Sequence, residues 1–388
     1  MIQSASVFTY ETENHEEALK DIQSQLSEKL KLMKYTAGIM HCGDDFIESG
    51  VASYISKMLP FAIVGATTNL QSINETYGAF MLTLTVMTSD DVAFVTSHTE
   101  GILEDLFGSV ERSFPNKEEL PDMPLKLILA YPPLADVLSG DNFANAFEAI
   151  YGKVPVFGSI AVEEEIMTSE RNSVICNGKC FKNEMSYLLI YGNVNPRFFI
   201  SNIRQSNLMQ AGTITKASDN VVHEIDGITA IDFFKNIGFV QNNAMKNGVE
   251  FVPFVLTVKD GNETTQFIRG LVNFDDNGSI QCRGTMYEGA VLSIGSNSAE
   301  DIISSSLNTT EIINAEDNIQ LALIYSCIVR RTVLISNPQI ELETVRKAIR
   351  QDIPHMMAYA GGEICPHPLA SNTVINRFHN FSLIACLL

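Results

Sequence analysis

The sequence is poor in basic residues and lacks any long apolar run. Lys and Arg number 26 against 46 Asp and Glu, which gives a formal net charge of −20 at pH 7. Such a charge repels nucleic-acid phosphates and anionic lipid, and no cluster of basic residues offsets it, so we expect neither a nucleic acid nor a membrane as partner. No stretch approaches the ~18 apolar residues of a membrane-spanning helix, and the first residues lack a signal-peptide pattern. The sequence therefore predicts a soluble, cytoplasmic protein.

Motifs for catalysis and metal binding are also missing. There is no HExxH, no CxxC pair, no GxSxG, no P-loop and no dinucleotide-binding fingerprint. The seven cysteines are an odd number scattered along the chain, which favours free thiols in a reducing compartment. Cys176 and Cys180 flank an Asn-Gly hairpin turn whose register points the two sulfur atoms to opposite faces, so no disulfide is expected between them. We expect no enzymatic activity and no bound metal.

What the chain does contain is 45% hydrophobic and 19% charged residues, typical of a packed globular protein, over a length sufficient for two domains. Within it a strand–helix–strand unit with at least one further strand occurs three times. The expected elements are Tyr35–Cys42, Phe46–Met58, Phe61–Gly65 and Gly78–Met87 in the first unit; Leu125–Tyr131, Asn142–Tyr151, Val154–Gly158, Ser173–Cys176 and Met185–Tyr191 in the second; and Ile319–Cys327, Pro338–Ile349, Met356–Gly361 and Phe381–Leu388 in the third.

The second strand of every unit is preceded by a proline and ended by a glycine (Pro60, Pro155 and Pro354; Gly65, Gly158 and Gly361). Proline excludes the residue before it from the helical region, which marks the change from helix to strand. A right-handed crossover places the first and second strands of a unit parallel, and the loops at their carboxyl ends are where α/β sheets bind ligands. Because the spacings differ, we interpret the units as divergent repeats.

An antiparallel meander is expected between the second and third units. The segments Phe251–Asp260, Thr264–Asn273 and Ser279–Met286 alternate apolar and polar residues between Asp/Asn/Gly turns, and Ser298 with Asp301 begins a helix that reaches about Ser306. The predicted fold class is α/β, with mixed sheets built from three βαβ-plus-strand units and an antiparallel β meander. We predict two domains, 1–195 and 196–388, the second containing the meander at 212–290, the helix at 298–306 and a βαβ unit at 319–388.

The stretch Gly212–Phe234 combines two short strands, a turn at Asp226-Gly227 and a helix start capped by Thr229 with Asp232. This stretch closely resembles the junction between the N-terminal and C-terminal modules of the FIST domain family (F-box and intracellular signal transduction). The matching residues are Asn220-Val221-Val222, Glu224, Asp226-Gly227 and Ala230. Ser326-Cys327-Ile328-Val329-Arg330-Arg331 and Gly361-Gly362-Glu363-Ile364 agree with the family as well. The resemblance covers most of the chain from about Tyr35 to the C-terminus.

This resemblance implies a function in signal transduction. FIST modules are regarded as sensory domains for small ligands such as amino acids, so the chain is expected to be a stand-alone bacterial sensor, with a homodimer as one option. Because it carries no output module, it would signal through a separate protein: a histidine kinase of a two-component system, a cyclic-di-nucleotide enzyme or a chemoreceptor. Some FIST-like proteins of similar size are described as haem-bound gas sensors. A haem-binding nitric-oxide sensor acting on a histidine kinase or a cyclic-di-GMP enzyme is therefore the alternative.

The candidate ligand-binding residues lie in the third unit and in one equivalent loop. Cys327 and Arg330 follow the first strand of that unit, and Gly361, Gly362 and Glu363 follow its second strand, which contains Tyr359. A guanidinium and a carboxylate across a small cleft suit an amino acid zwitterion, and glycines expose backbone N–H groups. The alternative is an ion pair between Arg330 and Glu363 that joins two loops. Thr67 and Thr68 occupy the corresponding loop of the first unit, where they either bind ligand or close a turn.

Two further hypotheses involve cysteine. Some haem-responsive proteins contain a cysteine before a proline with a histidine beside it, and this pattern occurs in Cys365-Pro366-His367-Pro368. Cys365 and His367 are therefore the haem candidates. The alternative is a loop stiffened by proline. Cys42 and Cys327 each end a predicted strand beside charged residues, so either thiol is a conceivable nucleophile. No histidine is tied to Cys327 by a motif, and we favour a ligand sensor over a thiol enzyme.

Overall fold

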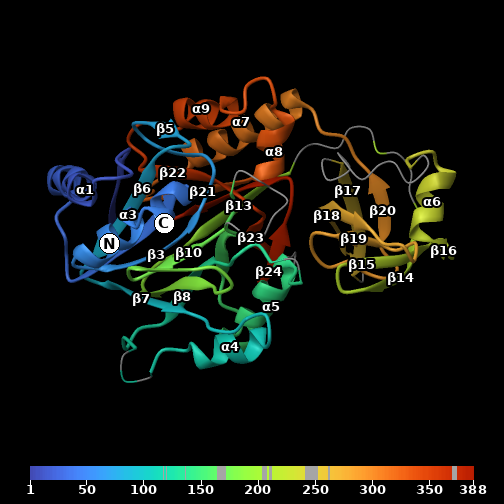
Figure 1. Cartoon of the computed structure of the whole chain (residues 1–388), viewed down its shortest axis with the longest axis horizontal. Helices are drawn as coiled ribbons and strands as arrows, with labels where there is room; N and C mark the ends of the chain where they lie inside the picture. Colours follow the sequence, from blue (N-terminus) through green and yellow to red (C-terminus); the bar gives the residue numbers. More distant parts are fainter. Residues whose placement is uncertain are drawn as a thin grey trace.

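The computed structural model describes residues 1–116, 118, 120–135, 137–163, 172–202, 208, 212–240, 252–260, 263–368 and 374–388. Its fold has two parts, a core of three mixed sheets with helices outside them and a smaller module of antiparallel strands at one end of the long axis (Figure 1). The predicted α/β class, with mixed sheets and an antiparallel meander, is confirmed.

Each predicted unit provides the central strands of a six-stranded sheet. The first-unit sheet is ordered β1-β6-β2-β3-β10-β11, the second-unit sheet β7-β12-β8-β9-β23-β24 and the third-unit sheet β13-β25-β21-β22-β4-β5. The strands of the first-unit sheet are β1 (Gln3–Thr9), β6 (Leu82–Ser89), β2 (Tyr35–Cys42), β3 (Ala62–Thr67), β10 (Val174–Cys176) and β11 (Lys179–Phe181). Those of the second-unit sheet are β7 (Val92–His98), β12 (Ser186–Gly192), β8 (Leu125–Tyr131), β9 (Val156–Ser159), β23 (Glu363–Pro368) and β24 (Val374–His379). Those of the third-unit sheet are β13 (Arg197–Asn202), β25 (Ser382–Leu387), β21 (Ala322–Cys327), β22 (His355–Ala360), β4 (Gln71–Ile73) and β5 (Tyr77–Gly78).

The first and second strands of every unit are parallel neighbours, as predicted. β2 pairs with β3, β8 with β9 and β21 with β22, and the last strand of each unit (β6, β12 or β25) lies antiparallel on the other side of the first. Pro60, Pro155 and Pro354 stand just before the second strands. The carbonyl oxygens of Pro155 and Pro354 accept hydrogen bonds from Ile128 and Ala322, both 2.9 Å long, which open the two parallel ladders in the same register.

The hairpin that follows each second strand belongs to the sheet of another unit. β4–β5 leaves the first unit and pairs with β22 of the third, β10–β11 leaves the second and pairs with β3 of the first, and β23–β24 leaves the third and pairs with β9 of the second. Each unit thus gives one hairpin and receives one, in a closed cycle with approximate threefold symmetry. The exchange joins the predicted segments 1–195 and 196–388, because strands from both share the second-unit and third-unit sheets.

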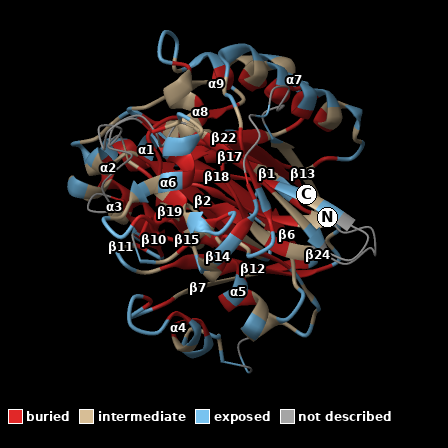
Figure 2. Cartoon of the chain, turned by 90° about the vertical axis from the view of Figure 1, so that its right-hand side faces the viewer, coloured by how far each residue is buried: buried red, intermediate tan, exposed pale blue. Residues whose placement is uncertain are grey.

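Apolar side chains from the inner faces of all three sheets pack into one central core. The first strand of each unit places one ring near the symmetry axis: His41, Tyr131 and Tyr325, whose ring centroids are 5.6, 5.7 and 6.3 Å apart. The tyrosine hydroxyls lie 3.0 Å from each other, whereas neither ring nitrogen of His41 has a hydrogen-bond partner. Figure 2 shows this buried interior continuing through the sheets.

Helices cover the outer faces of the sheets. α1 (His15–Lys29), α2 (Asp44–Glu48) and α3 (Val51–Met58) cover the first sheet, α4 (Leu106–Arg112) and α5 (Gly140–Tyr151) the second, and α7 (Ala299–Ala315), α8 (Ile328–Val333) and α9 (Ile340–Ala348) the third. Asn14 caps α1, since its side chain accepts a hydrogen bond from the backbone N–H of Glu17. No helix in the described ranges is long and apolar enough to cross a membrane.

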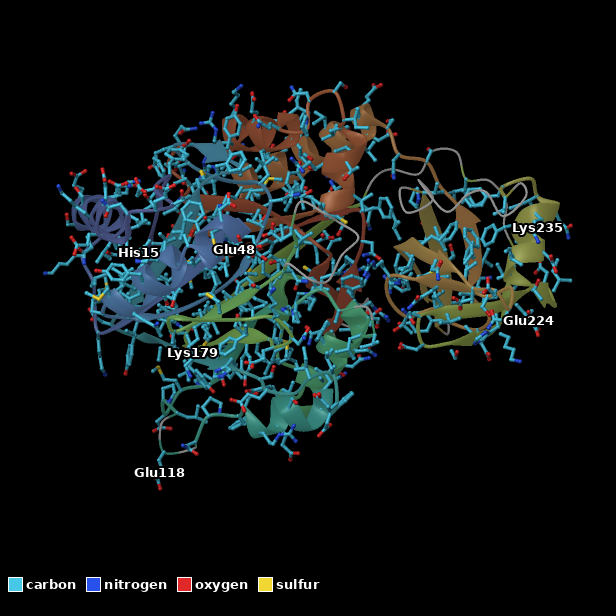
Figure 3. All side chains as sticks on the ribbon, viewed as in Figure 1. His15, Glu48, Glu118, Lys179, Glu224 and Lys235 are labelled. Carbon is cyan, nitrogen blue, oxygen red and sulfur yellow. The ribbon has the colours of Figure 1, made fainter. Side chains whose placement is uncertain are left out.

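The second part of the fold is inserted between β13 and α7. We call residues 212–294 the β14–β20 module; it contains β14 (Ile214–Ser218), β15 (Val221–Ile225), β16 (Ile228–Thr229), α6 (Ala230–Asn236), β17 (Pro253–Asp260), β18 (Glu263–Phe274), β19 (Ile280–Cys282) and β20 (Val291–Ile294). Its strands pair antiparallel and enclose a core of their own. The predicted cap is present, because Thr229 accepts a hydrogen bond from the N–H of Asp232. In Figure 3, Glu224 and Lys235 lie on the side of the module away from the three-sheet core.

Two helix predictions need correction. The single helix expected over Phe46–Met58 is divided into α2 and α3, because Gly50 between them adopts a left-handed φ of 82°. The helix expected to end near Ser306 continues to Ala315, since residues on the same face, such as Thr309 and Ile313, remain buried against the third-unit sheet.

The predicted glycine repeat is also only partly correct. Gly65 and Gly158 lie within β3 and β9, where an added Cβ would stand 1.9 and 1.8 Å from a backbone oxygen of the neighbouring parallel strand. Gly361 instead follows β22, and the equivalent register position in that strand is occupied by Met357. The glycines of the first two units permit close strand approach, whereas Gly361 belongs to a turn.

Candidate functional site

The predicted ligand-binding residues gather where β21 and β22 end. Cys327 is the last residue of β21 and pairs in register with Ala360 at the end of β22, so Gly361 follows directly beside it. Arg330 lies on α8, one turn after Cys327. A contact between these residues and a ligand stays a prediction, but the structure shows what each one contacts within the chain.

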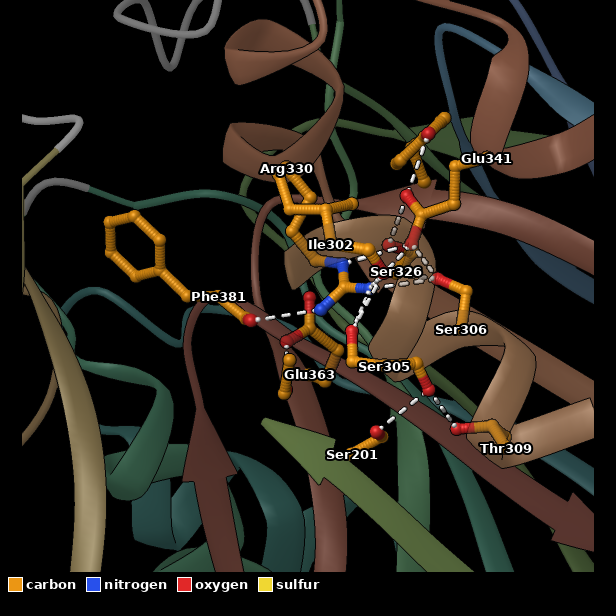
Figure 4. Close-up of polar contacts among 12 residues, drawn as sticks. Ser201, Ile302, Ser305, Ser306, Thr309, Ser326, Arg330, Glu341, Glu363 and Phe381 are labelled. Atoms are coloured by element: carbon orange, nitrogen blue, oxygen red, sulfur yellow. Dashed lines mark hydrogen bonds and ion pairs between the residues drawn. The ribbon is translucent and has the colours of Figure 1, made fainter. Parts of the chain in front are cut away.

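Arg330 is completely buried, and the protein itself occupies its guanidinium (Figure 4). It forms an ion pair with Glu341 of α9, with Nη2–Oε1 and Nε–Oε1 distances of 2.6 and 2.9 Å. Nη2 also donates to the hydroxyl oxygens of Ser305 and Ser306 on α7, each 2.9 Å away, and Nη1 donates to the carbonyl oxygen of Phe381 at 3.3 Å. Arg330 therefore joins α7, α8, α9 and the turn between β24 and β25.

The other predicted polar residues of this region are buried as well. The hydroxyl of Tyr359 donates to Oε2 of Glu341 at 2.8 Å. Oε2 of Glu363 accepts a 2.6 Å hydrogen bond from Ser382, while its Oε1 has no hydrogen-bond partner. Burial raises the pKa of the Glu363 carboxyl well above its usual value, which favours the neutral acid. The alternative of an ion pair between Arg330 and Glu363 is not formed, because Arg330 pairs with Glu341.

Thr67 and Thr68 use their hydroxyls to connect units of the core. The hydroxyl of Thr67 donates to the carbonyl oxygen of Ser173 and accepts from its N–H, at 3.3 and 3.0 Å. The hydroxyl of Thr68 donates to the carbonyl oxygen of Tyr359 at 2.8 Å. The two threonines thus lie at the joins where exchanged hairpins enter the first-unit and third-unit sheets.

Cys365 and His367, the haem candidates, lie in β23. The side chain of Cys365 packs in the central core, and burial raises the pKa of its thiol well above the ordinary value. His367 is half-buried, with its ring centroid 6.4 Å from that of His379. A haem ligand needs an accessible thiolate or imidazole beside a cavity, and neither residue lines the chambers described next. The buried thiol of Cys365 therefore offers a haem no accessible thiolate.

A cleft that the sequence did not predict lies between the β14–β20 module and the three-sheet core. It has a larger chamber of about 270 Å³ and a smaller one of about 40 Å³. Both chambers are lined by Leu134, Val272, Arg283 and Gly361, so they lie next to each other. The larger is also lined by Ala135, Leu138, Ser139, Gly140, Ile160, Asn220, Asn273, Gln281, Cys282, Gly284 and Phe378, and the smaller by Val162, Gly270, Leu271, Cys327, Ile328, Val329, Asn380 and Phe381.

The cleft lies at the carboxyl ends of parallel strands and at the N-terminus of a helix, two positions where ligands are expected in such folds. Leu134 and Ile160 follow the parallel strands β8 and β9, Cys327 is the last residue of β21 and Gly361 follows β22, so the floor is made by strand carboxyl ends. The N-terminus of α5 also opens on it through Ser139 and Gly140, which adds the partial positive charge of a helix start. The opposite wall comes from β18, from β19 with the two residues after it, and from Asn220 in the turn before β15.

A buried ion pair fixes the two walls against each other. Arg269 of β18 donates to Oδ2 of Asp141 on α5 at 3.0 Å and to the carbonyl oxygen of Phe378 at 3.0 Å. Oδ2 of Asp141 also accepts from the N–H of Thr285 at 2.8 Å, and its Oδ1 accepts from the N–H of Phe378 at 3.1 Å. Arg269 and Thr285 of the module thus both bind the carboxylate of Asp141 in the first turn of α5.

The described lining of the cleft includes a basic side chain. Among the described residues that line its chambers, Arg283 is the one side chain with a full charge at neutral pH. Arg283 is half-buried and follows β19, a position with no motif around it that sequence reasoning could have used. Asn220 and Gly361 were within reach of such reasoning, since both lie in stretches that carry the family resemblance, yet only Gly361 was predicted as a site residue.

The thiols of Cys42 and Cys327 are both buried, and burial raises the pKa of each well above its ordinary value, which keeps them protonated. In the described part of the chain, no group of three or more His, Cys, Asp or Glu side chains is arranged to hold a metal ion.

Comparison with known proteins identifies two domains of one family. Sequence comparison with curated proteins finds no match. Family models match twice, the FIST N domain over residues 36–228 and the FIST C domain over residues 230–366. FIST domains are associated with the sensing of small ligands in signal transduction. Since the two matches together span most of its length, the chain belongs to the FIST family.

Proposed function

We propose that this protein is an intracellular sensor that binds a small ligand, an amino acid or a similar small anion, in the cleft between its two parts. One observation carries the proposal: the cavity of about 270 Å³ is walled by both the three-sheet core and the β14–β20 module. A ligand that contacts both walls binds more tightly to one relative packing of the two parts than to another, and such differential affinity is what a sensor requires.

A chain of contacts from the cleft to the outer helices supports the proposal. Phe378 lines the larger chamber and accepts a hydrogen bond from Arg269, while Phe381 lines the smaller chamber and accepts one from Arg330. Arg330 in turn contacts α7 and α9 through Ser305 and Glu341. A ligand that moves the turn between β24 and β25 would therefore bias the packing of α7, α8 and α9.

The output belongs to a separate protein in this proposal. The partner classes that the family suggests are a histidine kinase, a cyclic-di-nucleotide enzyme and a chemoreceptor-type protein. The layer formed by α7, α8 and α9 is the surface we assign to it, because Arg330 connects that layer to the cleft. The exposed Leu307, Ile335 and Ile340 lie in this layer and give such a partner apolar contacts.

The proposal is tested by hydrogen exchange of the whole chain with and without candidate amino acids and small carboxylates. A ligand at a hundred times its Kd stabilises the folded state by about 2.7 kcal/mol, so protection should rise in peptides from both walls, around residues 134–140 and 270–284. Arg283→Gln should abolish the effect, whereas Arg112→Gln on the distant α4 should retain it. Protection confined to one wall, or equal in both variants, would count against a shared cleft site.

A further inference from the structure

The β14–β20 module contacts the three-sheet core in two places that differ in chemistry. In the first, which we call the polar contact, Arg269 and the N–H of Thr285 bind the carboxylate of Asp141. The second, the apolar contact, is a buried cluster of two module side chains and three core side chains. Its members are Val255, Ile268, Ile302, Leu334 and Phe381.

The polar contact includes a fully desolvated ion pair that also holds the backbone of Phe378. The N–H of Phe378 donates to Oδ1 of Asp141 at 3.1 Å, and its carbonyl oxygen accepts from Nη1 of Arg269 at 3.0 Å. The Arg269 and Asp141 side chains are 0% and 7% exposed. If the module moves away, both charges regain their hydration, which offsets much of the lost attraction. Such a contact separates at a lower cost than an apolar one of similar size.

A second arginine extends the polar contact along β24. Nη1 of Arg377 donates to the hydroxyl of Tyr287 at 3.0 Å, and its guanidinium lies 4.8 Å from the ring centroid of Phe267. The guanidinium of Arg269 lies 5.4 Å from the same centroid. One ring of the module therefore interacts with a guanidinium from each part of the molecule.

The apolar contact lies where the chain passes between the two parts. β13, the last core strand before the module, ends at Asn202, which pairs with Ser382 directly after Phe381. α7, the first core element after the module, begins at Ala299, three residues before Ile302. Because both connections start beside the apolar contact, a motion of the module is expected to be a rotation about this end, as in a hinge.

The cleft lies between the two contacts. Gly140 and Phe378, which adjoin or belong to the polar contact, line the larger chamber, and Phe381 of the apolar contact lines the smaller one. A rotation that separates the polar contact while the apolar contact stays packed would therefore widen the larger chamber.

The apolar contact also connects the module to the outer helices. Ile302 belongs to α7 and Leu334 directly follows α8. The carbonyl oxygen of Ile302 accepts a 3.2 Å hydrogen bond from Nη2 of Arg330, which pairs with Glu341 of α9 (Figure 4). A rotation of the module about Ile302 would thus bias the packing of all three helices.

We infer that the β14–β20 module is a hinged lid over the cleft. It rotates about the apolar contact, and the polar contact holds it closed. The rotation itself needs no ligand, whereas its use in signalling rests on the proposed function.

Hydrogen exchange of the full chain without ligand tests the lid. Arg269→Met leaves Asp141 without its charged partner in the closed state, so opening should become more frequent by on the order of 100-fold. Exchange should accelerate by a similar factor in peptides that cover 283–288 and 376–379, and it should stay slow in a peptide that covers 299–303 of the apolar contact. Arg269→Lys keeps the charge and should cause a smaller acceleration.

Arg330→Met is the matched control, because it removes the other completely buried arginine, whose partners all belong to the core. It should leave exchange at 283–288 slow. Circular dichroism and slow exchange in β8 show that each variant is folded. If Arg269→Met does not fold, Arg269→Lys carries the same comparison with a smaller expected change.

Acceleration limited to the polar contact, and absent in Arg330→Met, supports the lid. Equal acceleration at both contacts would mean that the module separates as a whole, which overturns the hinge. Acceleration that extends through β8 and β17, or none at 283–288, would make Arg269 a purely structural residue and overturn the lid. The proposed function is tested separately, by the exchange changes that a ligand causes, so the two can fail independently.

Discussion

At the scale of single residues, several polar side chains are fully buried, and they differ in whether hydrogen bonds compensate for their burial. Arg330 and Arg269 are each fully buried, and each has a carboxylate partner and further acceptors. His41, at the centre of the three sheets, has none: both of its ring nitrogens lack a hydrogen-bond partner. Burial therefore lowers the pKa of His41 to about 3, which keeps its imidazole neutral in the folded protein.

This shift predicts a loss of stability on acidification. The folded pKa lies below the ordinary value of about 6.5, so the unfolded chain binds more protons and the contribution of His41 is lost as the pH falls from about 6.5 toward 3. Each pH unit in that range costs about 1.4 kcal/mol, or about 2 kcal/mol between pH 6.5 and pH 5. His41→Leu should reduce this dependence in urea unfolding measured at several pH values, and the part that comes from His379, whose pKa burial also lowers to about 3, should remain. Tyr131→Phe, at the equivalent position, should keep it; an equal pH dependence in wild type and His41→Leu would contradict the argument.

At the scale of elements, much of the core could be predicted from the sequence. Period-two apolar runs and the prolines before β3, β9 and β22 located the strands of the three parallel pairs to within three residues at every end. The sheet to which each hairpin belongs could not be predicted, because apolar alternation sets which face of β10 or β23 is buried and says nothing about its neighbour. The site was harder still: Arg283 carries no local pattern, and the cleft exists only because an inserted module rests on distant strand ends.

The close strand approach at two glycines gives a prediction at this scale. Gly65→Ala and Gly158→Ala would place a methyl group 1.9 and 1.8 Å from the carbonyl oxygens of Met40 and Ala130, so each should destabilise the protein by about 3 kcal/mol or more in chemical unfolding. Gly43→Ala, whose new Cβ would be 3.8 Å from its nearest neighbour, is the matched control and should cost far less. Near-equal losses in all three variants would show that the strands can separate to accept a side chain.

At the scale of the whole molecule, the exchange of hairpins makes the three units depend on one another. The second-unit sheet lacks two of its six strands without β23–β24, and β4–β5 has no strand to pair with when β22 is absent. The two FIST modules recognised in the sequence meet near residue 229, yet strands from both sides of that point share these sheets.

The interlocked core should therefore not be divisible at a sequence boundary. The segment 1–195 expressed alone should show no cooperative thermal transition by circular dichroism, because its exposed strand edges and its half of the central core remain uncovered. Co-expression with 196–388 should restore a single transition and a stable heterodimer on size exclusion. A cooperative transition of 1–195 alone, near the Tm of the intact chain, would show instead that the first two units are self-sufficient.

The pairing of β4 with β22 also determines how long the hairpin β4–β5 remains unpaired while the chain is synthesised on the ribosome. Ile73 pairs with Met356, so the hairpin β4–β5 must wait for roughly 280 further residues to be synthesised before its partner strand exists. At about 5–20 residues per second this delay is roughly 15–60 s, far longer than the microseconds in which a hairpin forms. Throughout that interval an unpaired strand edge is exposed, so synthesis of this protein is the stage at which we expect its dependence on chaperones to be greatest.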